Sequence, residues 1–150
     1  MNSCTVQIIP HNSPLYHQAV ELRLAVLRGE AHQKAFSDEE LKSEKAHVHI
    51  AALDEEGRVI GTAMLADESP RVKMQRVAVA PDVQGQGIGA DMLAFSEDWA
   101  AKKGFTEVYV HARDTAVPFY EKHGFSPMDT YFDEDGLPHL KMNKRLTQLR

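Results

Sequence analysis

Apolar and polar positions follow two different periods along this chain, and the changes of period divide it into strands and helices. Segments 5–9, 47–53, 59–65 and 107–113 are short, rich in β-branched residues and bounded by turn-forming residues, which predicts strands. The turn Glu55-Glu56-Gly57 joins 47–53 to 59–65 in an expected β-hairpin. Segments 125–132 and 137–146 predict two closing strands around a turn at 133–136.

Helices are expected where apolar residues recur every three or four positions behind a capping residue. Ser13 and the proline after it predict the N-cap and first position of a helix that runs to Gly29. Ser37 and Glu40 have the spacing of a capping box, which begins a second short helix. A later helix is capped by Asp114 or Thr115 and ends at Gly124. The polar segment 32–45 is poorly patterned and is interpreted as a mobile cover for a site.

The stretch 73–104 predicts a strand, a glycine-rich loop and a helix in succession. The strand stops at Pro81, which has no N–H to donate to a sheet. Gly85, Gly87 and Gly89 then alternate, and the missing Cβ atoms allow tight turns and close approach of a ligand. An apolar stripe at helical spacing follows and ends at Gly104. Because free N–H groups at the start of this helix would point at one spot, the loop is a candidate anion site.

Three loop types bind anions in this way. A mononucleotide P-loop needs Gly-Lys-Ser/Thr, whereas Gly89 is followed by Ala90, so that type is excluded. Gly85, Gly87 and Ala90 satisfy the dinucleotide fingerprint, although four residues separate this loop from its strand. The pattern Gln/Arg-x-x-Gly-x-Gly/Ala is matched by Gln84, Gly87 and Gly89.

Composition narrows the class of partner. The chain has 150 residues, 43% hydrophobic and 26% charged, which is typical of one soluble globular domain. A net charge of −5 argues against a nucleic-acid partner held by electrostatics. The single Cys4 excludes an internal disulfide. No signal peptide or spanning apolar run is present, so we expect a cytoplasmic protein with no membrane partner.

Two pairs of residues have both a structural and a functional interpretation. His47 and His49 would share one strand face, but no Cys or third His at local spacing completes a metal site, so no metal is expected. Arg23 and Arg28 complement a helix dipole, or one of them faces a substrate cleft.

The glycine loop resembles the pyrophosphate-binding motif of the GNAT superfamily of acyl-CoA-dependent N-acyltransferases. Residues 116–125 look like its second motif, a short helix with a tyrosine after an aromatic residue and a Gly-Phe end. With Glu134-Asp-Gly-Leu-Pro-His139, the pattern is similar to small single-domain bacterial members over residues 46–146. The resemblance implies one N-acetyltransferase domain over 1–150, of the α/β class, with a central mixed sheet flanked by helices.

The resemblance also implies acetyl-CoA as cosubstrate, lying between the splayed ends of the strands around 77–79 and 108–110. An N–H near Val77 or Ala78 would stabilise the thioester oxyanion. The implied cofactor-binding residues are Val77, Ala78, Val79, Gln84, Gly85, Gln86, Gly87, Ile88, Gly89 and Ala90.

Tyr120 matches the family position of the acid that protonates the departing thiolate. The base stays open between Glu68, His111, Asp114 and a water chain. Many relatives carry an asparagine after the strand that here ends His111-Ala-Arg113-Asp114, so this chain departs from the family pattern at that point.

We therefore expect an N-acetyltransferase acting on a primary amine of a small molecule. A catalytically silent acyl-CoA sensor and a nicotinamide-dependent enzyme stay as alternatives, and the resemblance allows a homodimer. Acceptor contacts are expected in 11–45 and 130–140, where Glu134, Asp135 and His139 lie on or beside a turn. Carboxylates there would attract a cationic amine. If the acceptor were anionic, the arginines at 23, 28, 71 and 113 would be the residues of interest.

Overall fold

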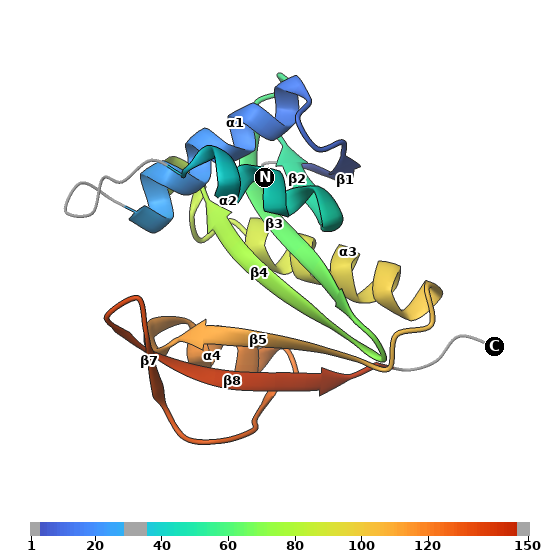
Figure 1. The fold of residues 1–150 in the computed structure, drawn as a ribbon, viewed down its shortest axis with the longest axis vertical. Coiled ribbons are helices and arrows are strands. Elements are labelled where there is room, and N and C mark those ends of the chain that lie inside the picture. Colours follow the sequence, from blue (N-terminus) through green and yellow to red (C-terminus); the bar gives the residue numbers. More distant parts are fainter. Residues whose placement is uncertain (1–3, 29–35, 147–150) are drawn as a thin grey trace. The chain divides into compact units, whose positions relative to one another are not determined.

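The computed structural model describes residues 4–28 and 36–146, and its strands form one mixed sheet flanked by helices (Figure 1). The strand order is β1-β2-β3-β4-β5-β8-β6, with β7 also paired to β8. This arrangement confirms the expected fold class. The strands are β1 (Thr5–Ile9), β2 (Val48–Leu53), β3 (Val59–Glu68), β4 (Arg71–Val79), β5 (Glu107–Arg113), β6 (Ser126–Pro127), β7 (Phe132–Glu134) and β8 (Leu137–Arg145). The α-helices are α1 (Pro14–Arg23), α2 (Asp38–Ser43), α3 (Ile88–Lys102) and α4 (Val117–Lys122).

The chain divides into two compact units. The first contains the chain up to Ala66 and residues 76–96, and the second contains residues 67–75 and the chain from Glu97 onward. Within the described residues, no helix is both long and apolar enough to cross a membrane.

The first unit is built on three neighbouring antiparallel strands, β1, β2 and β3. Gly57 has a φ of 83° in the predicted hairpin turn, where an L side chain would be strained. Both predicted caps are present, because the Ser13 hydroxyl accepts from the N–H of Tyr16 and Ser37 and Glu40 form the full capping box. After α1 the chain continues as a π-helical turn, Leu24–Arg28. The predicted end at Gly29, the Arg28 side chain and much of the supposed mobile cover lie outside the described residues.

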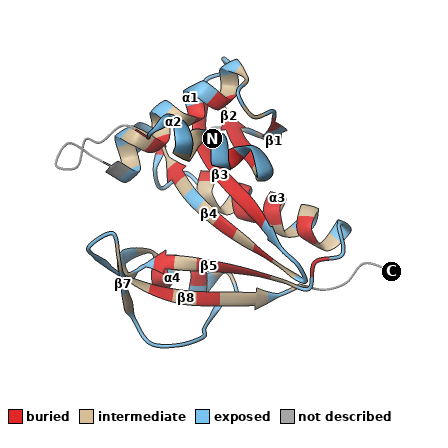
Figure 2. Ribbon diagram, in the orientation of Figure 1, coloured by how far each residue is buried: buried red, intermediate tan, exposed pale blue. Residues whose placement is uncertain are grey.

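Two packing contacts hold helices against these three strands of the first unit. Tyr16 and Ala19 of α1 are buried with residues of β1, β2 and β3 (Figure 2). The start of α3 lies against β3 at Gly61, where an added Cβ would stand only 3.0 Å from Ile88 Cγ2. Because this glycine leaves room for Ile88 and Met92, α3 begins close to the sheet.

The second unit contains a strand pair whose two faces differ in chemistry. Strand β5 runs parallel to β4, as predicted, and antiparallel to β8. The face that packs away from solvent is apolar and fully buried; its residues are Val108, Val110, Ala112, Leu140 and Met142. Residues opposite one another across β5 and β8 share a face, so the polar face carries Tyr109 with Asn143, His111 with Lys141 and Arg113 with His139.

Two predictions for the second unit were wrong. Neither Asp114 nor Thr115 caps α4, because 114–116 form a 3-10 turn and the N-cap is Ala116, which makes no side-chain hydrogen bond. The single closing strand at 125–132 is instead two short pieces, β6 and β7, and between them the Asp129 carboxylate accepts a hydrogen bond from the N–H of Thr130. The turn between β7 and β8 is correspondingly shorter, with positive φ angles at Asp135 and Gly136.

Candidate active site

The predicted cofactor-binding residues all belong to the first unit. Gly85 and Gly87 have φ angles of 82° and 87°, so the loop uses a backbone conformation that other residues rarely adopt. An added Cβ at either position would meet nothing within 4 Å, which leaves that side of the loop open. The Gln84 side-chain amide donates to the carbonyl of Val79 at 3.1 Å and ties the loop to the end of β4. Ile88 is buried and anchors the start of α3.

The start of α3 presents backbone donors beside this loop. The N–H of Asp91 donates to the Gly87 carbonyl at 2.9 Å. The N–H groups of Ile88, Gly89 and Ala90 precede it in the first helical turn, where no helical acceptor is available to them. Free N–H groups and the positive end of the helix dipole together favour a phosphate-type anion.

Strand β4 is interrupted just before the predicted oxyanion-binding residues. Arg76 has a φ of 54°, which is rare for a residue with a side chain and breaks the extended conformation. Val77, Ala78 and Val79 follow it, with Ala78 buried and the two valines partly exposed. A local break of this kind frees backbone groups from the regular ladder.

Tyr120, in the second unit, lies on the buried face of α4. Its ring packs against Phe119 and Phe125, at centroid distances of 5.2 and 5.3 Å. Its hydroxyl makes no hydrogen bond with any residue that the structure describes. Burial raises the pKa of Tyr120 to about 12, so the hydroxyl keeps its proton at neutral pH.

The three candidate bases, also in the second unit, differ in their partners. Glu68 Oε1 accepts a hydrogen bond of 2.5 Å from the Tyr109 hydroxyl. Asp114 Oδ1 accepts one of 2.9 Å from Arg113 Nε, and both side chains of this pair are more than a third exposed. His111 Nδ1 lies 3.0 Å from Glu134 Oε1.

The sequence placed Glu134 and His139 beside one turn but gave no reason to pair either of them with His111. The structure brings them together: His139 Nε2 lies 3.7 Å from Glu134 Oε2, and His139 Nδ1 donates to the Leu137 carbonyl. The alternation of polar and apolar residues in 107–113 already indicates that His111 lies on a polar strand face. Asp135 is exposed and is placed at the turn.

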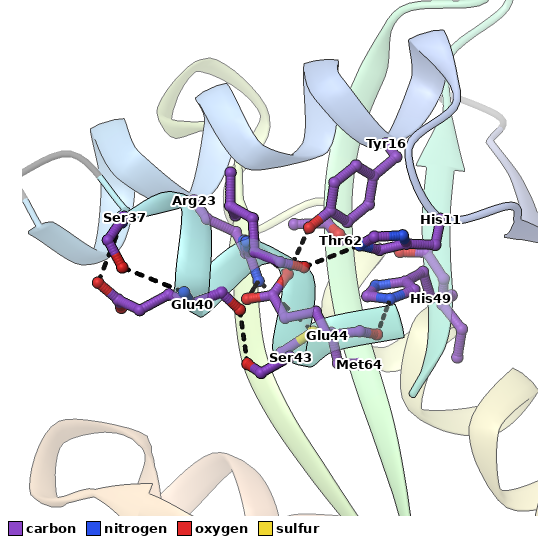
Figure 3. Close-up of polar contacts among 12 residues, drawn as sticks. His11, Tyr16, Arg23, Ser37, Glu40, Ser43, Glu44, His49, Thr62 and Met64 are labelled. Carbon is purple, nitrogen blue, oxygen red and sulfur yellow. Dashed lines mark hydrogen bonds and ion pairs between the residues drawn. The ribbon is translucent and has the colours of Figure 1, made fainter. Parts of the chain in front are cut away.

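Arg23 proves to be part of a buried polar cluster in the first unit (Figure 3). Its guanidinium donates twice to Glu44, both times at 3.0 Å, and both side chains are less than a tenth exposed. Tyr16 donates to the same carboxylate at 2.7 Å, and His49 Nε2 donates to the Glu44 carbonyl at 2.8 Å. Burial lowers the pKa of His49. Arg23 is therefore committed to Glu44 rather than presented to a ligand.

A model of the acetyltransferase (GNAT) domain matches residues 15–146 of this chain. The chain belongs to the GNAT acetyltransferase family. This GNAT chain is 31% identical over 107 residues to YjcF of Bacillus subtilis (strain 168), an uncharacterized N-acetyltransferase, covering 71% of the chain and 74% of YjcF. The resemblance found in the sequence is thereby confirmed, and the chain is an acyltransferase.

Solved structures agree with this assignment. A protein from Lactobacillus plantarum, named as an N-acetyltransferase, has a TM-score of 0.81 and 29% identity, with 95% of this chain and 99% of that one covered. The paia N-acetyltransferase of Thermoplasma acidophilum, in complex with coenzyme A, has a TM-score of 0.72, with 95% of this chain and 99% of that one covered. At 19% identity this similarity shows a shared fold, and the bound coenzyme A is an observation made on the Thermoplasma protein.

Proposed function

We propose that this GNAT protein transfers an acetyl group from acetyl-CoA directly to a primary amine of a small molecule. The observation that carries the proposal is the open loop 84–90, with left-handed Gly85 and Gly87 leading into the first turn of α3. Its backbone donors suit the pyrophosphate of a CoA thioester. We assign the cytosol as its compartment, since that is where acetyl-CoA would reach it.

The proposal gives roles to three sets of residues. Residues 84–90 hold the pyrophosphate, and an N–H at Val77 or Ala78 donates to the oxyanion as the thioester carbonyl is attacked. Acetyl-CoA supplies the activated acetyl group. Tyr120 donates its proton to the departing thiolate; in support, its hydroxyl is protonated at neutral pH and has no hydrogen-bond partner among the described residues.

Two measurements test the function. Titration calorimetry with coenzyme A tests the loop, and thiol release from acetyl-CoA in the presence of a panel of primary amines tests the transfer. Binding together with amine-dependent thiol release is the expected result. Binding with no thiol release from any amine would instead indicate an acyl-CoA sensor. No affinity for coenzyme A, with an absorbance change on adding reduced nicotinamide cofactor, would favour a dinucleotide enzyme.

A further inference from the structure

In two of the three candidate bases, Glu68 and Asp114, one carboxylate oxygen already accepts a hydrogen bond from a neighbouring side chain. Glu68 Oε1 is held by the Tyr109 hydroxyl at 2.5 Å, and the Arg71 guanidinium lies 4.7 Å from the centre of the same tyrosine ring. Asp114 Oδ1 is held by Arg113 Nε. Each carboxylate keeps its second oxygen, but the contact orients the group toward its own partner rather than toward an acceptor.

His111 differs because its one hydrogen bond leaves the other ring nitrogen available. An ionised carboxylate has no proton to donate, so the bond of 3.0 Å requires Nδ1 to carry the proton and Glu134 to accept. The neutral ring then has its lone pair on Nε2. No described residue makes a hydrogen bond to Nε2, and the side chain is 24% exposed.

The carboxylate that orients His111 is itself held in place. Glu134 Oε2 faces His139 Nε2 at 3.7 Å, and Phe132, two residues earlier on β7, packs its ring edge-to-face on His111 at 5.1 Å. Partial burial alone would raise the pKa of Glu134, but the hydrogen bond from His111 and the charges of His111, His139 and Lys73 lower it overall. Glu134 therefore stays ionised at neutral pH.

Charged and titratable groups surround His111 from each neighbouring strand. Glu134 faces it from β7, while Lys141 lies opposite it and His139 two positions away on β8. Tyr109 lies beside it on β5, and Lys73 of β4 pairs with Tyr109 in the parallel register. Glu134 is thus the carboxylate in direct contact with the ring.

We propose that His111 is the catalytic base, with Nε2 taking a proton from the acceptor's ammonium group, and that Glu134 is a positioning residue that keeps the other proton on Nδ1. This inference rests on the proposed acetyl transfer. The ammonium group loses two protons in all. His111 takes the first and passes it to solvent. The second leaves the nitrogen for solvent as the N–C bond forms and the C–S bond breaks. Tyr120, which has given its proton to the thiolate, regains one from solvent, so one proton is released in each turnover.

Kinetics of matched variants test the role of the base, using the panel amine that the wild-type protein acetylates fastest. His111→Gln should lower kcat/KM by about 10²–10⁴-fold, leave the affinity for coenzyme A unchanged and remove the fall in rate on the acid side of the pH profile. His47→Gln, at a partly exposed position just before β2, should behave as wild type. Wild-type kinetics in His111→Gln would overturn the inference while the acetyl transfer stands. A wild-type protein that acetylates no amine would overturn the proposed function, and the inference with it.

The role of Glu134 has its own readouts. Glu134→Gln should move the acid-side fall to lower pH, because the protonated imidazole loses its carboxylate partner, whereas a merely structural residue would leave the profile in place. In the wild-type protein, ¹⁵N NMR of the histidine rings should find the neutral His111 protonated on Nδ1. A proton found on Nε2 would overturn the inference even if no variant folds.

Discussion

At the scale of single residues, Tyr120 combines burial with a hydroxyl that has no partner among the described residues. Because burial raises its pKa to about 12, the hydroxyl stays protonated at neutral pH and is available as an acid rather than as a base. Tyr120→Phe keeps the ring packing on Phe119 and Phe125 and removes the donor. We expect kcat to fall by about 10²–10⁴-fold while the affinity for coenzyme A stays constant.

Urea denaturation of Tyr120→Phe is the control, because lost packing would lower its free energy of unfolding whereas loss of the acid alone would not. Thiol-release rates and calorimetry on this variant and on the wild-type protein then report the loss of the acid. Equal turnover in Tyr120→Phe and wild type would mean that the proton comes from another group.

The buried pair of Arg23 and Glu44 gives a prediction about stability. Glu44→Gln leaves the Arg23 guanidinium buried without its counter-charge, which should lower the free energy of unfolding by about 3–5 kcal/mol. Asp98→Asn breaks the pair with Lys102, whose side chains are 63% and 60% exposed, and should cost at most about 1 kcal/mol. Urea denaturation measures both changes, and equal losses would contradict the assigned role of Arg23.

At the scale of elements, the loop before α3 can be tested against another left-handed glycine in the same unit. Gly87 and Gly57 have φ angles of 87° and 83°, and both have open space around an added Cβ. Gly87→Ala and Gly57→Ala should therefore cost similar stability, about 1–2 kcal/mol each. Only Gly87→Ala should weaken coenzyme A binding, measured by calorimetry. If both variants or neither lose affinity, the loop is not the binding site.

Elements whose signals are local could be predicted from the sequence. Ser13, Ser37 and Gly57 each act on their immediate neighbours, and the structure has them in the predicted roles. The end of the sheet could not be predicted in this way. The segment 125–132 suggests one strand, but only 126–127 and 132 lie in strands, and between them Asp129 accepts a hydrogen bond from the N–H of Thr130.

The candidate site divides along the same line. The glycine pattern at 84–90 and the position of Tyr120 lie in short motifs, so the sequence could single them out. The contact of His111 with Glu134 joins residues 23 positions apart, and it exists only because β5, β8 and β7 pair in one particular register. Sequence spacing carries no information on that register, which side-chain packing decides.

At the scale of the whole molecule, His49 should make stability depend on pH. Its pKa is lowered in the folded state, chiefly by burial, so the unfolded chain binds the extra proton more readily. The neutral His49 contributes fully to the free energy of unfolding above its ordinary pKa of about 6.5. This contribution is lost as the pH falls through that value toward the lower pKa of the folded state. The pKa of Glu134 is also lowered in the folded state, but protonation of Glu134 reduces stability only in the more acidic range below about 4.3.

We therefore expect the free energy of unfolding in urea to fall between pH 7.5 and pH 5.5, and His49→Gln to flatten this dependence. His47→Gln, at a less buried position, is the control and should keep the wild-type slope. A slope that survives in His49→Gln would assign the effect to another group.

The net charge of −5 gives a prediction for the proposed amine acceptor. A cationic amine should be acetylated with higher kcat/KM than the amino acid that differs from it by one carboxylate, because the protein's field favours the cation. Exposed charges are screened over about 8–10 Å at physiological ionic strength, so added salt should narrow the difference. Preference for the amino acid, or a ratio that ignores salt, would contradict a cationic acceptor.

The boundaries between the two compact units fall inside β3, β4 and α3, which limits how the chain can be divided into fragments. Each of them begins in one compact unit and ends in the other, because the boundaries fall after Ala66, after Gln75 and after Ser96. No single cut releases an intact unit, and every cut at a boundary leaves two broken ends of secondary structure with unpaired backbone groups. Half-proteins made at these boundaries should therefore fail to fold alone. Split reporters and domain grafts need their joints in exposed turns such as the one at Gly57.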